Sequence, residues 1–351
     1  MTTPFLFGLE IETAPPTRRG DANVIPTLES IAEAERSGFD LVLLRDSFDR
    51  APGADGFDAL LVAATSAAAT TSIGLIVVTD TIHTEPFHLA KNLATLDIVS
   101  SGRAAWAPTI STSSAAIDLF GRRSATERDA LWREAGASVE VVRRLLDSWE
   151  DGAVIRDVET GRYIDRDLVH RIDFESEYFT IRGPSITPRS PQGQIPVLID
   201  ATIEGADELT PVADLVLIEA LDPVDGAGQR QQILSRTTRD HAPKVLAAID
   251  VALTASRAVR AERTVTEGAR HFTGSPAELL EHLSAWQPFV DGVLVRPAAD
   301  ETTRNLLPSL PVRAVVGDEA LLTATSSLSA RLGIEHQPSR YAASGARGAS
   351  S

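Results

Sequence analysis

Acidic and hydroxyl-bearing side chains recur where short apolar runs of the sequence end, and they are the first candidates for chemistry. Carboxylates at such places transfer protons or bind cationic groups, and hydroxyls bind polar ligands. The same residue types are also common in turns and at helix N-caps, so position alone does not select the active ones. The set comprises Glu10, Glu12, Asp46, residues 79–84, residues 109–112, residues 200–204, Glu219 and Arg296.

Motifs of the familiar catalytic classes are missing. His83 and His88 flank Glu85, but Pro86 starts a helix between them and the H-E-x-x-H spacing is absent, so we expect no metal site. Neither the G-x-S-x-G of a hydrolase nor a P-loop is present. The chain has no cysteine, which excludes disulfides, thiolate zinc sites, iron–sulfur clusters and a cysteine nucleophile.

Eight strand-like runs alternate with amphipathic stretches and would position these side chains. The runs start at Phe5, Phe39, Ile73, Ala104, Pro196, Leu215, Val245 and Gly292. Helices are expected over residues 24–37, 58–71, 86–100, 126–150, 204–212, 225–240 and 276–286. Eight such units predict an α/β fold, a (β/α)8 TIM barrel forming one domain over residues 1–337. A doubly wound open sheet is the competing fold, although no G-x-G-x-x-G follows the first strand.

Two segments depart from this rhythm. Residues 151–195 are rich in charges and aromatics and are predicted to form a hairpin and loop excursion, with strands over 154–156 and 178–181. Residues 338–351 are rich in Ser, Ala and Gly and are predicted to be a loose tail.

Composition excludes several classes of function. Of the 351 residues, 43% are hydrophobic and 23% charged, as in an ordinary globular protein. The net charge of -16 repels phosphate backbones and anionic lipids, so we expect neither nucleic-acid nor membrane binding. No apolar run approaches the ~20 residues of a membrane span, and no secretory signal is visible, so a cytoplasmic protein is expected.

Several blocks, in order along nearly the whole chain, resemble the bacterial-luciferase superfamily, and within it the nitrilotriacetate/dibenzothiophene-sulfone monooxygenase branch. The first reads HTEPFHLAKNLATLD from His83 and continues IVSSGRAAW to Trp106. The others are VEVVRRLLDSWE from Val139, the pieces HRID, EYFTIRGP and PRSPQG between Val169 and Pro196, and the closing RLGI and SRYA.

The resemblance implies a TIM barrel that uses reduced FMN, delivered by a partner flavin reductase. It also implies that O2 oxidises a small organic substrate through a flavin C4a-peroxide. Asp46 stands where the family has an aspartate beside the flavin, and Thr81 stands where the family has hydroxyl contacts to the ring. No catalytic residue is implied.

At other positions this chain departs from the family pattern. Arg128 and Trp132 replace a His and Tyr pair before the long helix. In the phosphate loop after the fifth strand, Asp200 replaces Gln, Thr202 replaces Gly, and the Ser position falls at Ile203 or Glu204. A carboxylate there would repel a phosphate, so FMN binding is expected to be weak or lost. The exceptions are that Arg128, with Lys91 or Arg296, takes over phosphate binding, or that Glu204 faces solvent as an acid at a helix N-terminus. The lid-forming insertion after the seventh strand is also shortened, around residues 254–268.

Three functions therefore remain open. The first is a two-component FMN-dependent monooxygenase. The second is a non-catalytic relative, acting as a heteromer subunit or ligand-binding protein, and the third is a deazaflavin-dependent oxidoreductase. We also expect a dimer or larger homo-oligomer, because Leu60, Leu61, Leu93 and Leu96 would give the second and third helices an apolar surface.

Overall fold

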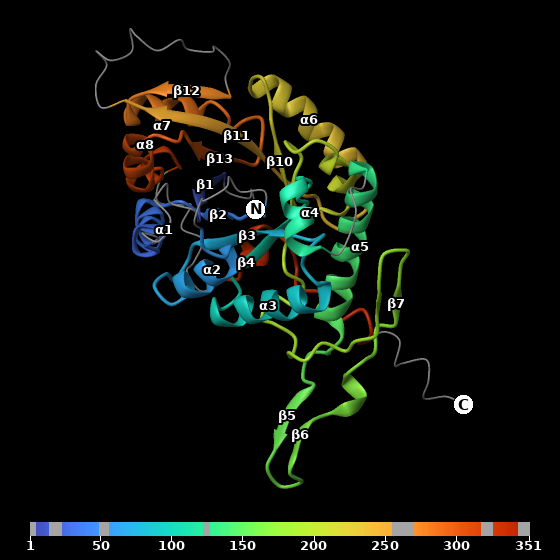
Figure 1. The fold of residues 1–351 in the computed structure, drawn as a ribbon. Helices are drawn as coiled ribbons and strands as arrows, with labels where there is room; N and C mark the ends of the chain where they lie inside the picture. The colour runs from blue at the N-terminus through green and yellow to red at the C-terminus, as the bar shows by residue number, and fades with distance from the viewer. Residues whose placement is uncertain are drawn as a thin grey trace.

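A barrel of eight parallel strands forms the centre of the molecule (Figure 1). The structure is a computed structural model and describes residues 5–13, 23–48, 56–121, 127–254, 270–316 and 326–342. The strands are β1 (Leu6–Glu12), β2 (Leu41–Arg45), β3 (Gly74–Asp80), β4 (Ala104–Thr109), β9 (Leu198–Asp200), β10 (Leu215–Ile218), β11 (Lys244–Leu253) and β13 (Gly292–Pro297).

The strands pair in the order β4-β3-β2-β1-β13-β11-β10-β9, and a parallel bridge between Trp106 and Val197 joins the two ends. This closure confirms the predicted TIM barrel and excludes the open sheet. A further strand, β12 (His271–Gly274), pairs with the far end of β11 and was not predicted. Residues 255–269, where the shortened insertion was expected, lie outside the described residues.

Helices surround the barrel and cover its strands (Figure 1). They are α1 (Ile25–Ser37), α2 (Ala59–Ala67), α3 (Pro86–Val99), α4 (Ser114–Phe120), α5 (Arg128–Asp147), α6 (Pro223–Arg236), α7 (Pro276–Ser284), α8 (Glu301–Leu306), α9 (Arg313–Val316) and α10 (Leu328–Arg331). The α-helix expected over 204–212 is instead a 3-10 helix, η2 (Ala206–Val212), because Pro211 lies inside this short segment and cannot donate a helical hydrogen bond. None of the described helices is both long and apolar enough to span a membrane.

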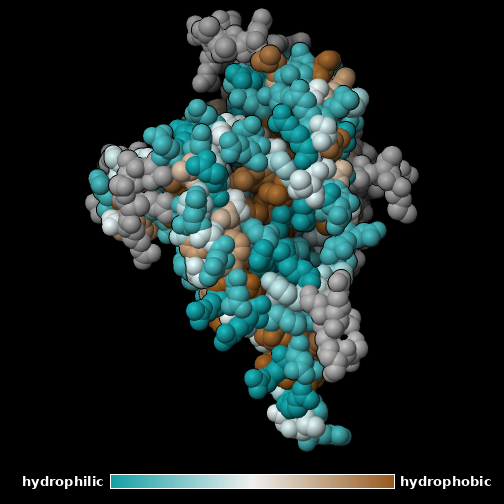
Figure 2. Space-filling view, turned by 90° about the vertical axis from the view of Figure 1, so that its right-hand side faces the viewer, coloured by the Kyte–Doolittle hydropathy of each residue, from teal (hydrophilic) through white to brown (hydrophobic). Residues whose placement is uncertain are grey.

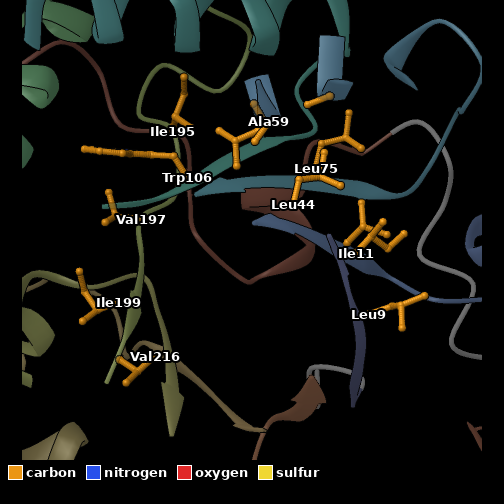
Figure 3. Packing of buried hydrophobic residues seen from close by; sticks show 14 of the residues in the cluster. Leu9, Ile11, Leu44, Ala59, Leu75, Trp106, Ile195, Val197, Ile199 and Val216 are labelled. Carbon is orange, nitrogen blue, oxygen red and sulfur yellow. The ribbon is translucent and has the colours of Figure 1, made fainter. Parts of the chain in front are cut away.

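Alternating strand residues build two apolar layers, as the period of two in a strand requires. Outward-facing residues such as Leu9, Leu44, Leu75 and Trp106 pack under the helices (Figure 3). Inward-facing residues fill the barrel, and Leu328 and Leu332, at and just after α10, join them. The inner cluster contains Leu6, Leu41, Leu43, Ile76, Val78, Leu198, Leu215, Leu217, Leu246 and Leu294. Because Leu328 lies against Gly74 at the start of β3, α10 closes the N-terminal end of the barrel.

Among the glycines of the described barrel strands, Gly292 has the least space for a side chain, and replacing it by alanine is expected to destabilise the protein. A Cβ there would lie 2.5 Å from the Leu6 carbonyl oxygen and 2.6 Å from Leu246 Cδ2. Overpacking of this kind costs about 1–3 kcal/mol of unfolding free energy. Gly228→Ala in α6 is the matched control, because nothing lies within 4 Å of its added methyl group and alanine favours the helix. Urea unfolding of both variants gives the comparison, and a G292A protein as stable as the parent would contradict this packing.

The excursion between α5 and β9 contains two antiparallel hairpins rather than one. One pairs β5 (Val154–Asp157) with β6 (Arg162–Ile164), and the other pairs β7 (Phe174–Glu175) with β8 (Thr180–Ile181). Figure 1 shows the first hairpin projecting away from the barrel. Both predicted strands exist, but they belong to different hairpins.

The described end of the chain packs on α5. Ser339 is buried and its hydroxyl donates to the Asp147 carbonyl oxygen at 2.7 Å, and the Tyr341 ring stacks on His170. Residues 343–351 lie outside the described residues.

Two of the leucines expected to form an oligomer interface are core residues. Leu93 and Leu96 are fully buried against neighbouring helices and strands, because they lie on the inner face of α3. Their assignment to an interface is therefore wrong. Leu61 of α2 is 65% exposed, and Ile98 and Val99 are exposed at the end of α3. The oligomeric state itself stays a prediction.

Candidate functional site

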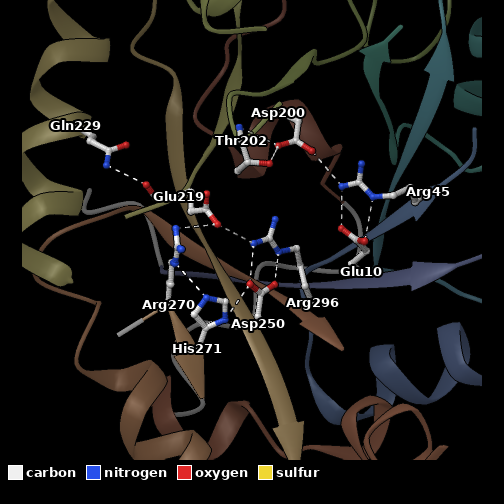
Figure 4. A network of polar contacts seen from close by, with 10 residues as sticks. All are labelled: Glu10, Arg45, Asp200, Thr202, Glu219, Gln229, Asp250, Arg270, His271 and Arg296. Carbon is white, nitrogen blue, oxygen red and sulfur yellow. Dashed lines mark hydrogen bonds and ion pairs between the residues drawn. The ribbon is translucent and has the colours of Figure 1, made fainter. Parts of the chain in front are cut away.

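Charged side chains replace leucines in the last inward-facing layer of the barrel, at the C-terminal ends of the strands. In β2 the inward positions read Leu41, Leu43 and then Arg45, and in β11 they read Leu246, Ala248 and then Asp250. TIM barrels carry their active sites at this end. We call the following set the mouth network: Glu10, Arg45, Asp200, Glu219, Asp250, Arg270, His271 and Arg296 (Figure 4).

One half of the mouth network is centred on Arg45. Its guanidinium binds both carboxylate oxygens of Glu10, at 3.0 and 2.9 Å, and Asp200 Oδ2 at 3.0 Å. Burial alone would lower the pKa of Arg45, but the two carboxylates outweigh it and raise this pKa, so the guanidinium stays charged. Thr202 donates its hydroxyl to the other oxygen of Asp200 at 2.6 Å.

The other half is centred on Arg296, which binds both oxygens of Asp250 at 2.7 and 3.1 Å (Figure 4). The second oxygen of Asp250 also lies 3.3 Å from His271 Nδ1. Arg270 lies 3.2 Å from Glu219 and donates its Nε–H to His271 Nε2 at 3.1 Å. Asp250, His271 and Arg296 lie on β11, β12 and β13, while Glu219 follows β10 and Arg270 precedes β12. Because β13 neighbours β1 and β10 neighbours β9, this half adjoins the Arg45 half on both sides.

Asp46 lies on the rim beside Arg45. Its carboxylate accepts the backbone N–H of Ser47 at 2.8 Å and of Ala59 at 3.2 Å, which fixes its orientation at the start of α2. It lines a cavity of about 90 Å³ together with Thr79, Asp80 and His88.

Asp80 is the buried titratable group of this rim. Its Oδ1 accepts the backbone N–H groups of Ile82 and His83 at 2.9 and 2.7 Å. Burial raises the pKa of Asp80, and the hydrogen bonds and the nearby His83 only partly oppose this. The hydroxyl of Ser111 lies close enough to lower the pKa, but neither that hydroxyl nor Asp80 Oδ2 makes a hydrogen bond of normal geometry.

Arg128, Trp132 and Glu204 form a separate group between α5 and the loop after β9. Arg128 pairs with Glu204 at 2.8 Å, and Trp132 Nε1 donates to the Glu204 carbonyl oxygen at 2.9 Å. Gly205 has φ +86°, and a Cβ there would lie 2.7 Å from the Trp132 ring, so this loop needs glycine. Because the Glu204 side chain is 83% exposed, it faces solvent, which is the alternative orientation considered for it above.

The predicted site residues therefore fall into several places. Asp46 lines the rim cavity, whereas Thr81 is buried and donates its hydroxyl to the Thr109 carbonyl oxygen, and Trp132 is buried beside Gly205. Neither the rim cavity nor the larger cavity described below is lined by all three of these residues. The Thr202 hydroxyl donates to Asp200, which belongs to the Arg45 half of the mouth network. Flavin contacts of all six residues stay predictions.

The two histidines near Glu85 are engaged separately. The His83 ring stacks on Phe120 at 4.6 Å between centroids, and His88 Nε2 lies 2.9 Å from Asn92 Nδ2. Within the described parts of the chain, no cluster of three or more His, Asp or Glu side chains is arranged to hold a metal ion.

A larger cavity of about 510 Å³ opens between the strand and helix layers near the ends of β1 and β13. Leu9, Ile11, Pro26, Pro297 and Leu307 give it an apolar wall, and Glu10 connects this wall with the mouth network. On the face where α5 and α6 lie, Figure 2 shows hydrophobic side chains gathered near the centre within a hydrophilic surround.

Sequence reasoning identified Glu10, Asp200, Glu219 and Arg296 at strand ends but missed Arg45, Asp250, Arg270 and His271. A signal for the first two was available, because each continues the inward alternation of its strand. No comparable signal marks Arg270 and His271, whose placement depends on the pairing of β12 with β11.

Comparison with known proteins gives consistent results. The model of a family described as luciferase-like monooxygenase matches residues 5–307. N-acetyl-S-(2-succino)cysteine monooxygenase of Bacillus subtilis is 37% identical over 178 residues, which are 49% of this chain and 40% of that protein. Nitrilotriacetate monooxygenase component A of Aminobacter aminovorans is 36% identical over 190 residues, 49% of this chain and 42% of that protein. The chain thus spans less than half the length of these two relatives.

A third relative is matched over more of its length. A subunit of the pristinamycin IIA synthase of Streptomyces pristinaespiralis is 32% identical over 216 residues, 61% of this chain and 69% of that protein. Among solved structures, the EDTA monooxygenase from Chelativorans sp. BNC1 superposes with a TM-score of 0.79 at 17% identity. That superposition covers 95% of this chain and 99% of the other. At that identity the likeness concerns the fold.

Proposed function

Since this chain belongs to the luciferase-like monooxygenase family, we propose that it oxidises a small organic substrate with O2 and a reduced flavin supplied by a partner reductase. The matches confirm the resemblance stated from the sequence. A charged layer at the active end of the barrel is the observation that carries the proposal. It gives a chain of this family a polar site where a TIM barrel performs chemistry.

A reduced flavin would supply the electrons that activate O2, and the chain would supply binding, orientation and exclusion of water. Asp46 suits a ring contact, because two backbone N–H groups hold its carboxylate on the rim. The aliphatic residues beneath the mouth network keep water from the barrel interior. No step of the reaction is assigned to a particular residue.

The groups expected at the flavin phosphate fit a dianion poorly. Glu204 neutralises Arg128, and the Thr202 hydroxyl donates to Asp200 instead of facing a ligand. The Ile203 N–H donates to the Asp200 carbonyl oxygen at 3.1 Å, which removes one donor of a backbone cradle. We therefore propose weak flavin binding, dominated by the ring.

The test is an anaerobic titration of the purified protein with reduced FMN, followed by flavin fluorescence. We expect saturable binding of reduced FMN and weaker binding of oxidised FMN. With a flavin reductase and NADH present, O2 uptake should then respond to substrate. Binding of neither form would contradict the proposal. Binding of a reduced deazaflavin, with no binding of either FMN form, would identify a deazaflavin as the cofactor.

A second function, that of a non-catalytic subunit, is favoured by two observations. The Arg128–Glu204 pair leaves no net positive charge for a phosphate, and one relative is itself named as a subunit. In that case the isolated protein binds no flavin, but it restores or raises the activity of a luciferase-like partner chain when the two are mixed. The flavin titration separates this function from the first.

A further inference from the structure

Asp80 Oδ2 is a buried acceptor that makes no hydrogen bond of normal geometry, although the Ser111 hydroxyl lies near this carboxylate. The residue is only 4% exposed, and its other oxygen is used by the backbone N–H groups of Ile82 and His83. Leaving a buried carboxylate oxygen unpaired is unfavourable, so the structure leaves a place for a donor. Asp80 lies at the end of β3, where it continues the inward alternation of Ile76 and Val78.

The space beside Asp80 suits a small polar head group. The rim cavity measures about 90 Å³, which is enough for a few water molecules or a small polar head group. Its polar lining consists of acceptors and neutral groups: Asp46, Ser47, Asp58, Thr79, Asp80, Thr84, His88 and Asn92. Three of these eight polar side chains are carboxylates and neither Lys nor Arg is among the lining residues, which favours a head group that donates hydrogen bonds.

The charges around the cavity favour a cation. The mouth network contains four carboxylates and three guanidiniums, and each guanidinium is already bound by a carboxylate of the chain. With Asp80 on the rim, carboxylates outnumber guanidiniums by five to three among these described residues. Burial raises the pKa of Asp80, and a cation bound beside it would stabilise the charged form.

We propose that the mouth of the barrel takes a substrate with a protonated amine, whose ammonium group binds Asp80 in the rim cavity, and that it excludes polycarboxylates. This inference rests on the proposed function and names the substrate class for that site. The ammonium group supplies the donor that Asp80 Oδ2 lacks, and its tail extends toward the mouth network. The names of three similar proteins, by contrast, point to polycarboxylates: succinocysteine, nitrilotriacetate and EDTA.

A polycarboxylate would need guanidiniums that are free to bind it. Here a substrate carboxylate would have to displace Asp250 from Arg296, or Glu10 and Asp200 from Arg45. Each displacement would leave a carboxylate of the chain without its counter-ion in a partly buried site, which is strongly unfavourable. The mouth therefore selects against anions through its own ion pairs.

Direct binding of matched probes tests the inference without flavin. The probes are n-pentylamine, n-pentanol, pentanoate and nitrilotriacetate, measured against the full chain at pH 7 by ligand-observed NMR. We expect pentylamine to bind at least tenfold more tightly than pentanol, and the two anions to show no saturable binding. Asp80→Asn should weaken pentylamine binding at least tenfold. Glu281→Gln, which removes an exposed charge from α7, should change it less than twofold.

A readout on the unaltered protein covers the case in which the Asp80 variant does not fold. The backbone N–H signals of Ile82 and His83, which donate to Asp80, should shift with pentylamine and not with pentanol. Equal binding of pentanoate or nitrilotriacetate would overturn the inference, as would unchanged pentylamine binding by Asp80→Asn. Binding of no probe would show that Asp80 binds water only. Because flavin is absent, these outcomes are independent of the flavin titration.

Discussion

Asp214→Asn is expected to lower the unfolding free energy at pH 7 by about 3–5 kcal/mol, the usual loss when one partner of a buried ion pair is removed. Asp214 is 3% exposed, and its carboxylate binds Arg143 at 3.0 Å, Arg239 at 3.1 Å and His241 at 2.9 Å. It also accepts the Val197 N–H, which fixes the start of β9. The variant would remove the carboxylate that contacts Arg143, whose side chain is 6% exposed.

The effect should depend on pH in a defined direction. Burial alone would raise the pKa of Asp214, but the hydrogen bond from His241 and the charges of Arg143 and Arg239 outweigh it and lower this pKa. A lowered carboxyl pKa stabilises the fold above the ordinary pKa near 4, and this contribution is lost as the pH falls through the folded-state value. The difference between parent and variant should therefore shrink below about pH 4.

Urea unfolding at pH 7 and at pH 3.5 measures both quantities. Glu33→Gln is the control, because Glu33 pairs with the exposed Arg36 one helical turn away and such pairs contribute little. An Asp214→Asn protein with unchanged stability at pH 7 would contradict this prediction. It would show that the negative charge of Asp214 is not needed to hold Arg143, Arg239 and His241.

Glu204→Gln is expected to tighten FMN binding about tenfold, which is about 1.4 kcal/mol. The change frees Arg128, whose guanidinium is now held by Glu204, to bind the flavin phosphate. A charged hydrogen bond contributes about 1.5–3 kcal/mol, and the low end applies because both side chains are exposed to solvent. This exposure also makes the repulsion expected from the sequence smaller than for a buried carboxylate.

Riboflavin, which lacks the phosphate, provides the internal control and should bind the parent and the variant equally. The double variant Arg128→Ala/Glu204→Gln should lose the gain, and Glu208→Gln, an exposed acid on η2, should not produce it. Calorimetry with both flavins measures these values. An equal gain for riboflavin would mean that the loop acts on the ring instead of on the phosphate.

The fold was predictable because each barrel strand carries its own local signal. All eight runs of β-branched and aliphatic residues became strands, and Pro86 marked the start of α3 as expected. The strand pairing in the excursion was harder to predict. Each strand there pairs with another a few residues away in the sequence, and β-propensity does not indicate which one. For η2, the helical pattern was present but Pro211 changed the hydrogen bonding.

The position of the candidate site and several of its charged residues were predictable, but the ion pairs between them were not. Sequence position placed Glu10, Asp200 and Arg296 at strand ends, yet their partners come from strands far apart in the chain. Arg45 joins residues 35 and 155 positions away, and no local pattern encodes such distances. The family resemblance directed attention to a phosphate loop, whereas Thr202 is held by Asp200 and Arg128 by Glu204.

The weak closure of the barrel between β4 and β9 has a consequence for how the chain could be divided. There a single bridge, Trp106 to Val197, completes the ring, while the opposite seam between β1 and β13 pairs four residues of each strand. The excursion belongs to the segment that connects β4 with β9, the two strands of this weak seam. Val158, at the tip of its first hairpin, is 93% exposed. A cut at that tip yields two pieces with four barrel strands each. Neither half-barrel can cover its apolar strands alone, so neither piece should be active by itself. Activity of the divided protein would therefore report the association of the two pieces.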